Sequence, residues 1–282
     1  MGVFTIEIPM SPSKFMEKPR PASIVMPLLS QRDEWLEQSL LSALGQTIEC
    51  EVLVITSPKT PNNNLDVLER IGAVNSNMQI HCRDQHQNFA GAINLGIQLA
   101  SSERIGLLFC DDWLRENAVE RCLPNATDIV STGSTIFDAD GKRVIIELKP
   151  TGEGFLARPT LERKAAYLKH FYLFRRDKLR EVGGVDEEIG LTGADDFDMI
   201  WTLLEQGATV SVVEESLHCY RDHSDIRLTL RSRNDQIRDI TKIFRKHGVP
   251  ESEISRLIAL HADWFGSLIQ DVLRTRTNPA PD

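Results

Sequence analysis

Short apolar segments rich in β-branched residues alternate with segments of helical periodicity through the first 120 residues. Such a chain forms parallel strands joined by crossover helices, because a parallel connection is too long for a tight turn. Helices then cover both faces of the sheet. The pattern predicts an α/β, Rossmann-like and mainly parallel sheet, with strands at Ala22–Met26, Glu51–Ile55, Met78–His81 and Ile105–Cys110, and helices from Asp33 to Gly45, at Leu65–Ile71 and at Gly91–Ala100.

The segments that directly follow these strands mark the expected site. In open sheets of this kind, ligands bind outside the carboxyl ends of the strands. The segments at that edge are Pro27–Ser30, Thr56–Ser57 and Asp111–Asp112. We therefore expect the chemistry of the protein there.

The second half of the chain has a different pattern. Asp138–Gly141 reads Asp-Ala-Asp-Gly between two apolar segments, which predicts a β-hairpin. Asp195–Gln206 has helical periodicity and Thr209–Val213 is typical of a strand, while only helices are expected from about Arg231. The predicted organisation is a leader at 1–21, an α/β domain at 22–230 with halves at 22–120 and 121–230, and a C-terminal helical extension at 231–282.

Charge and cysteine content narrow the class of protein. The 282 residues contain 32 Lys and Arg against 41 Asp and Glu, a net charge of −9, which argues against a nucleic-acid binder. The five cysteines never form a C-x-x-C pair, which excludes a cysteine-based zinc site and favours a reducing compartment. Neither a signal-peptide pattern nor an apolar segment of membrane length occurs. We therefore expect a soluble, cytoplasmic protein without a transmembrane segment.

Two adjacent carboxylates, Asp111 and Asp112, follow the buried segment Leu107–Cys110. Hard oxygen ligands at the edge of a sheet suit a Mg²⁺ or Mn²⁺ ion that holds phosphates. Acidic residues in this position also cap helices, and Asp112 is placed to cap one over Trp113–Glu120. The residues by themselves leave both interpretations open.

Two more polar clusters lie downstream. Asp195, Asp196 and Asp198 open the predicted helix, where the macrodipole favours acids, and one of them beside a cleft would act as a general base. Arg221 and His223 follow a strand in a segment expected to be a loop. A guanidinium suits a phosphate, and an imidazole can complete a metal site with a carboxylate. Ordinary N-terminal charge placement and a buried structural histidine are the alternatives.

Taken in order, these segments resemble the family-2 glycosyltransferases, which have the GT-A fold and use nucleotide-sugar donors. The resemblance extends over roughly Ala22 to Thr229. Phe109–Leu114 lies where the family has its DxD motif, Asp195–Met199 is similar to the Glu-Asp-x-Asp-Leu motif, and Leu217–His223 is similar to the closing Tyr-Arg-x-His loop. Other similar segments are Ala22–Pro27, Ser42–Thr47, Asn88–Ile97 and Phe174–Glu187.

The resemblance implies an inverting glycosyltransferase that moves a sugar from a nucleoside-diphosphate-sugar donor to a hydroxyl of a glycan or other acceptor. Asp196 matches the catalytic base of the family, with Asp195 as the alternative. A divalent metal, Mn²⁺ or Mg²⁺, is implied at Asp111 and His223. The donor-binding positions that it implies are Pro27, Leu29, Thr56, Asn88, Gly91, Asp111, Asp112 and Arg221.

The sequence departs from the family pattern at several of these positions. Phe109 stands where the first Asp of DxD is expected, Leu28–Ser30 replaces an aromatic residue and Asn, and Thr56 replaces an acidic residue. These departures favour an alternative function, a degenerate GT-A module that binds a nucleotide sugar or a partner protein without catalysis. The carboxylates at Asp111 and Asp196 favour an active enzyme. The apolar stripes of the C-terminal helices are expected to pack on the domain or to form a homodimer interface.

Overall fold

Strand β1 (Ser23–Pro27) lies in the interior of the sheet, and all of its residues are buried. It pairs in parallel with β2 (Glu51–Thr56) and β4 (Arg104–Leu107), and β2 pairs in parallel with β3 (Met78–Cys82). The structure, a computed structural model, describes residues 20–86, 88–189, 193–225, 230, 232–262 and 265–277. The strands predicted for the first half are confirmed, with β4 ending three residues earlier than Cys110.

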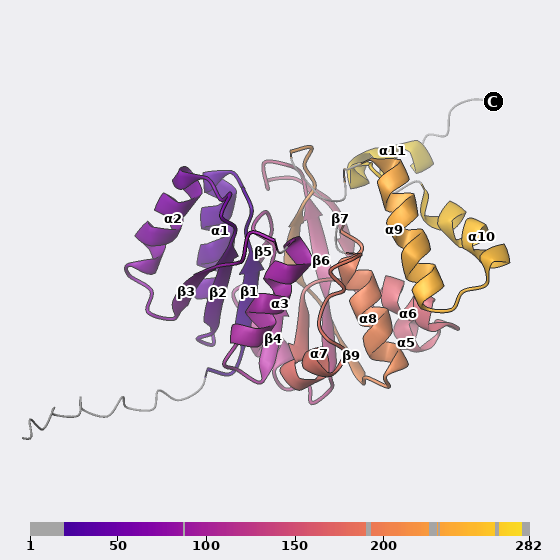
Figure 1. The fold of residues 1–282 in the computed structure, drawn as a ribbon, viewed down its shortest axis with the longest axis horizontal. Coiled ribbons are helices and arrows are strands. Elements are labelled where there is room, and N and C mark those ends of the chain that lie inside the picture. Colours follow the sequence, from indigo (N-terminus) through magenta and orange to yellow (C-terminus); the bar gives the residue numbers. More distant parts are fainter. Residues whose placement is uncertain are drawn as a thin grey trace, which may run out of the picture.

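Successive residues of β1 face two different hydrophobic cores, as the period of a strand requires. Ile24 and Met26 share a core with residues of α1 (Asp33–Leu44) and α2 (Asn62–Gly72). Val25 belongs to the other core, which includes residues of α3 (Phe89–Leu99). The predicted helices of the first half are thus confirmed, and they cover both faces of the sheet. Figure 1 shows α1 and α2 together at the end of the molecule formed by this half.

The sheet continues into the second half of the chain with mixed pairing. Within the described residues, nine strands form one sheet in the order β3-β2-β1-β4-β8-β6-β9-β5, with β7 paired to β6. Strand β6 is parallel to β9 and antiparallel to β7 and β8. The hairpin predicted at Asp138–Gly141 connects β6 and β7. These later strands are β5 (Trp113–Leu114), β6 (Ile129–Phe137), β7 (Val144–Leu148), β8 (Tyr172–Arg175) and β9 (Val210–Arg221).

Two local expectations are wrong for the same physical reason. Trp113 and Leu114 form β5 instead of starting a helix, and helix α4 begins later, at Ala118–Cys122. Leu217–Arg221, expected as a loop, is the end of β9. Strands β5 and β9 pair with each other although they lie far apart in the sequence. Strand formation of this kind depends on a tertiary partner, which local propensity does not reveal.

The C-terminal helices predicted from about Arg231 are confirmed, and they join the core of the domain. Phe244 of α9 is fully buried and its ring lies 6.2 Å from that of Trp201 in α8. Figure 1 shows α9 beside α8. The remaining helices are α5 (Gly152–Leu156), α6 (Leu161–Tyr167), α7 (Arg176–Glu181), α8 (Asp195–Glu205), α9 (Arg233–Lys246), α10 (Glu251–His261) and α11 (Ile269–Thr277).

The structure does not test three predictions about the organisation of the chain: the leader, the homodimer and the domain boundaries. Residues 1–19 of the predicted leader lie outside the described part of the chain. A homodimer formed through the C-terminal helices stays a prediction, as do the domain boundaries. In the described ranges, no helix combines the length and the apolar character that a membrane crossing requires.

Gly106→Ala is expected to lower the free energy of unfolding by about 1–3 kcal/mol, as overpacking of a core does. A Cβ atom at Gly106 would lie 2.5 Å from Cζ of Phe171, whose side chain is fully buried. Gly152→Ala is the matched control, since nothing lies within 4 Å of that Cβ. Chemical denaturation of both variants measures the difference. Equal stability of the two variants would contradict this packing argument.

Candidate active site

The loop after β4 carries Asp111 and Asp112, whose carboxylates make different contacts. Asp112 is 2% exposed, and its Oδ1 accepts the backbone N–H of Arg221 at 2.9 Å while its Oδ2 lies 3.2 Å from Nε2 of His218. The Asp111 side chain is 22% exposed, and its Oδ2 lies 3.1 Å from Nε2 of His223. Asp111 is therefore the carboxylate placed to meet a ligand. Asp112 holds the loop against β9, in place of the helix cap expected of it.

Arg221 is held by protein groups on every side of its guanidinium. Its Nε donates to the carbonyl of Asp111 at 3.0 Å, Nη1 to the carbonyl of Ala139 at 2.9 Å, and Nη2 to Oε1 of Gln38 at 2.5 Å. The guanidinium carbon also lies 4.8 Å from the ring centroids of two tryptophans, Trp35 and Trp113. In the structure Arg221 supports the backbone of Asp111. The phosphate contact expected of it stays a prediction.

His223 is the second residue predicted to bind a metal ion, and its side chain is 1% exposed. Its ring lies 4.5 Å from that of Trp35 in α1. Nδ1 accepts the N–H of Asp225 at 3.2 Å, and Nε2 faces the carboxylate of Asp111. Nε2 is therefore the ring atom placed to bind a cation.

The donor atoms of Asp111 and His223 fit one divalent ion whose other ligands come from outside the chain. One carboxylate and one imidazole suit Mn²⁺ or Mg²⁺. Within the described ranges, no group of three His, Cys, Asp or Glu side chains is arranged to hold a metal ion. The oxygens of a diphosphate and water would therefore have to complete the coordination.

The predicted donor-binding positions at the carboxyl ends of β1 and β2 lie at the same edge of the sheet as Asp111. Leu29 is 45% exposed there, whereas Thr56 is 3% exposed and its hydroxyl donates to the carbonyl of His81 at 3.3 Å. The carbonyl of Pro27 accepts the thiol of Cys110 at 3.5 Å. Leu29 thus offers a side chain to this surface, while Pro27 and Thr56 shape it from within the protein.

Asn88 and Gly91 lie where the first half of the chain meets the second. Oδ1 of Asn88 caps α3 by accepting the N–H of Gly91 at 2.9 Å, and Nδ2 donates to the carbonyl of Glu187 at 2.5 Å. One turn further, Oδ1 of Asn94 accepts the N–H of Val185 at 2.8 Å. These bonds fix the segment that precedes α8.

Three carboxylates at the start of α8 have three different surroundings. Asp195 is 5% exposed, and burial together with the charge of Asp196 raises the pKa of its carboxyl to about 7. Burial also acts to raise the pKa of Asp196, but the hydrogen bond and charge of His170 outweigh it, and that pKa is lowered. Asp198 is buried and accepts hydrogen bonds from Lys246 at 2.7 Å and His247 at 3.0 Å. Of Asp195 and Asp196, the ionised form is thus favoured at Asp196, and 28% of the Asp196 side chain is exposed.

Two histidines that the sequence analysis did not single out connect the two acidic motifs. Nε2 of His170 lies 2.8 Å from Oδ2 of Asp196, and Nε2 of His218 lies 3.2 Å from Oδ2 of Asp112. The centroids of the two imidazole rings are 5.6 Å apart. Burial lowers the pKa of His218 well below its usual range, so that ring is neutral. His218 lies within a recognised motif, whereas no sequence signal surrounds His170.

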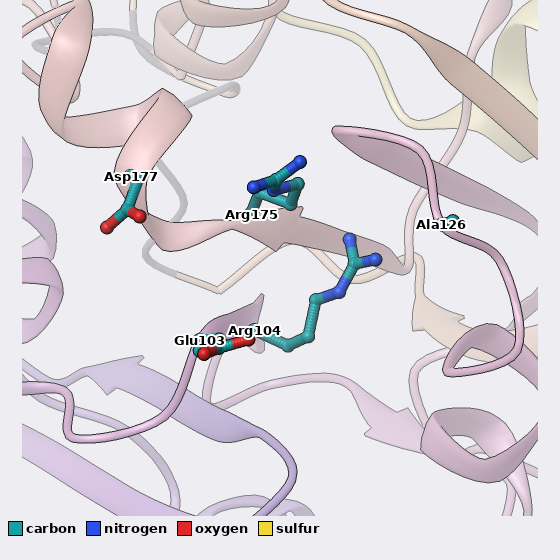
Figure 2. A pocket seen from close by; sticks show the side chains of 5 residues that line it. All are labelled: Glu103, Arg104, Ala126, Arg175 and Asp177. Carbon is teal, nitrogen blue, oxygen red and sulfur yellow. The ribbon is translucent and has the colours of Figure 1, made fainter.

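A separate cavity of about 210 Å³ lies at the opposite edge of the sheet. It is lined by Glu103, Arg104, Ala126, Arg175 and Asp177 (Figure 2). Arg104 begins β4 and Arg175 ends its antiparallel neighbour β8. Since Asp111 follows the carboxyl end of β4, this cavity is not part of the candidate active site.

The parallel half-sheet, the mixed second half and the acidic motifs at one edge define a GT-A glycosyltransferase fold. Two solved structures are similar to the chain as a whole. Staphylococcus aureus TarS 1–349 in complex with UDP-GlcNAc has a TM-score of 0.62 and 14% identity, over 92% of this chain and 76% of that one. The mannosyltransferase PcManGT from Pyrobaculum calidifontis, in complex with GDP-Man and Mn²⁺, has a TM-score of 0.61 and 15% identity, over 94% and 77%. At these identities the likeness shows the fold.

The chain belongs to glycosyl transferase family 2, whose sequence profile matches residues 23–183. Its class of enzyme is therefore glycosyltransferase, as the resemblance implied. The O-antigen biosynthesis protein RfbC of Myxococcus xanthus is 25% identical over 209 residues, which cover 72% of this chain. The match covers 16% of RfbC, so the chain spans a small part of the length of that relative.

Asp195→Asn is expected to flatten the pH dependence of stability. The pKa of Asp195 is about 7 in the folded protein, above the value of about 4 of an unfolded chain, so the folded state holds a proton that the unfolded state has lost. The stability of the wild-type protein should fall as the pH rises from about 5 to about 8, and the Asn variant should lose less stability over the same range. Thermal melts at both pH values measure this, with Asp177→Asn as an exposed control. Equal slopes for Asp195→Asn and wild type would contradict the assignment.

Proposed function

We propose that this chain transfers a sugar from a nucleoside-diphosphate-sugar donor to a hydroxyl of a glycan or other acceptor, with inversion at the anomeric carbon. The observation that carries this proposal is the cluster in which Asp112, the neighbour of Asp111, and the ionised Asp196 are connected through the contacts of His218 and His170. Family membership supports the reaction class. The donors bound by TarS and PcManGT support the donor class.

The name of the Myxococcus relative supports an acceptor from polysaccharide or glycoconjugate biosynthesis. We propose that the reaction takes place in the cytoplasm. The composition supports this, because five scattered cysteines without disulfide or metal spacing suit a reducing compartment.

We assign the role of general base to Asp196. A base must be ionised at the working pH, and the pKa of Asp196 is lowered while that of Asp195 is raised by burial. Asp196 is also the more exposed of the two. In a direct displacement the acceptor oxygen bonds to the anomeric carbon as its proton passes to Asp196. The bond from that carbon to the diphosphate oxygen breaks, and the nucleoside diphosphate leaves with the electron pair.

The negative charge that develops on the leaving diphosphate requires stabilisation. Asp111 and His223 would hold a divalent ion, Mn²⁺ or Mg²⁺, which supplies Lewis-acid stabilisation of that charge when bound. Asp112 and Arg221 keep the Asp111 loop in place from the protein side. The Mn²⁺ of the PcManGT structure supports this assignment.

We assign donor binding to the surface between the ends of β1 and β2 and the start of α3. Leu29 supplies an exposed apolar side chain there, in the place where the family has an aromatic ring. Pro27 and Thr56 form the adjoining edge, and the Asn88–Gly91 cap closes it on the side of α3.

Asp111→Asn is expected to remove metal-dependent donor binding. A thermal-shift panel would compare UDP, GDP, CDP and dTDP and their sugars, each with and without Mn²⁺, on wild type and on this variant. A ligand at a hundred times its dissociation constant stabilises the folded state by about 2.7 kcal/mol, which a melting curve resolves. The expected result is a shift with one nucleotide that needs both Mn²⁺ and Asp111. Asp177→Asn, a change of an exposed residue at the opposite edge of the sheet, is the control.

The absence of any shift in this panel would favour the alternative function, a GT-A module without catalysis. One observation supports that alternative. Phe109, in place of the first acid of the DxD motif, packs between Phe89 at 5.7 Å and His170 at 5.6 Å, and so brings no ligand to a metal.

Asp196→Asn is expected to lower turnover by about 10²–10⁴-fold while sparing donor binding, because only the proton acceptor is lost. Turnover is measured as the release of nucleoside diphosphate in the presence of acceptor, and donor binding by the thermal shift above. Asp195→Asn in the same assay distinguishes the two candidates for the base. Retained turnover in Asp196→Asn together with loss in Asp195→Asn would transfer the role to Asp195.

A further inference from the structure

Buried hydroxyl groups of β6 fix the backbone on which His170 stands. Ser131, Thr132 and Ser134 are each at most 4% exposed. Their hydroxyls make hydrogen bonds of 2.6–2.7 Å to the backbone of Lys169–Phe171, and Ser134 bonds to the carbonyl of His170 itself. Since β6 is also paired with β8, β9 and β7, it is a rigid support. The backbone of His170 therefore has little freedom to move.

The imidazole ring of His170 packs among three other rings, with 20% of the side chain exposed. Its centroid lies 4.5 Å from that of Tyr172, 5.6 Å from that of Phe109 and 5.6 Å from that of His218. Nε2 meets Oδ2 of Asp196 at 2.8 Å. An ionised carboxylate only accepts hydrogen bonds, so Nε2 carries a proton and donates it. The other oxygen of Asp196, Oδ1, accepts the N–H of Phe197 at 2.8 Å.

We propose that His170 is a positioning residue for Asp196, which it holds in one orientation and in the ionised form through the Nε2–H bond to Oδ2. The remaining lone pairs of the carboxylate are then left for the acceptor hydroxyl. This inference rests on the proposed function, in which Asp196 takes the acceptor proton. Catalysis requires that the residues around a base hold it within about half an ångström of its productive position.

The electrostatic reason for such a residue lies in the burial of Asp196, which disfavours the ionised form of its carboxyl group. Lys169 and His170 favour the negative charge of Asp196, and Nζ of Lys169 also donates to the carbonyl of Ala166 at 2.8 Å. The other titratable groups on this side are Tyr172 and His218, which burial keeps neutral. His170 thus makes the direct bond that opposes protonation of Asp196.

The test compares His170→Phe, which removes the donor, with His170→Gln, whose amide N–H is able to replace it. For His170→Phe we expect kcat to fall about 10- to 100-fold with little change in the donor KM. The acid limb of the kcat/KM profile should move to higher pH by about one unit, because Asp196 loses the hydrogen bond that lowers its pKa. His170→Gln should restore much of the rate and return the limb toward the wild-type position.

A double variant shows whether His170 acts through Asp196. If it does, His170→Phe in the Asp196→Asn background should slow turnover no further than Asp196→Asn does by itself. Donor-dependent thermal shifts of each variant report folding and donor binding separately from catalysis. His170→Gln keeps the test informative where His170→Phe is poorly folded.

Two results would overturn the inference. One is an acid limb that stays unmoved in His170→Phe and His170→Gln alike. The other is complete inactivity of both His170 variants with residual turnover in Asp196→Asn, which would make His170 itself the proton acceptor. Full turnover of Asp196→Asn would instead refute the assignment of the base in the proposed function, and is thereby distinguished from a failure of the inference about His170.

Discussion

The buried carboxylate of Asp112 joins the two halves of the sheet at the candidate active site. A carboxylate without water is stable only when protein donors surround it, and here the donors are the N–H of Arg221 and the ring of His218, both on β9. The end of β9 is thereby fixed against the loop after β4. Arg221 then donates to the backbone of Asp111 and His223 lies beside the Asp111 carboxylate, so this part of the candidate site depends on the contacts of Asp112.

The C-terminal helices support the site through two further buried acids, each close in sequence to a residue of the site. Asp198, two residues after Asp196, binds Lys246 and His247 at the C-terminal end of α9. Asp222, one residue before His223, accepts hydrogen bonds from the N–H groups of Ile269 and Gln270 at the start of α11. Acids at a helix N-terminus are stabilised by its free N–H groups. The extension thus belongs to the framework of the site.

The acids of α8 show how one short motif can hold different protonation states. Burial and the charge of Asp196 raise the pKa of Asp195. Asp196 has His170, and its pKa falls although burial acts in the other direction. The sequence Asp-Asp-Phe-Asp does not distinguish these residues; their neighbours in the segment before β8 and on α9 do. The separation of pKa values is what assigns a base within a group of similar carboxylates.

The sequence by itself determined the α/β class, the parallel half-sheet, the C-terminal helices and the edge of the sheet where the site lies, because periodicity, apolar strands and strand-end polarity are local properties. It also placed Asp111, Asp196 and His223 in motifs. It did not show that Leu217–Arg221 continues β9, that Arg221 is enclosed by Trp35 and Trp113, or that His170 meets Asp196. Each of these is a contact between segments distant in the chain. Only the tertiary structure decided them, because a partner's position depends on how the whole sheet is paired.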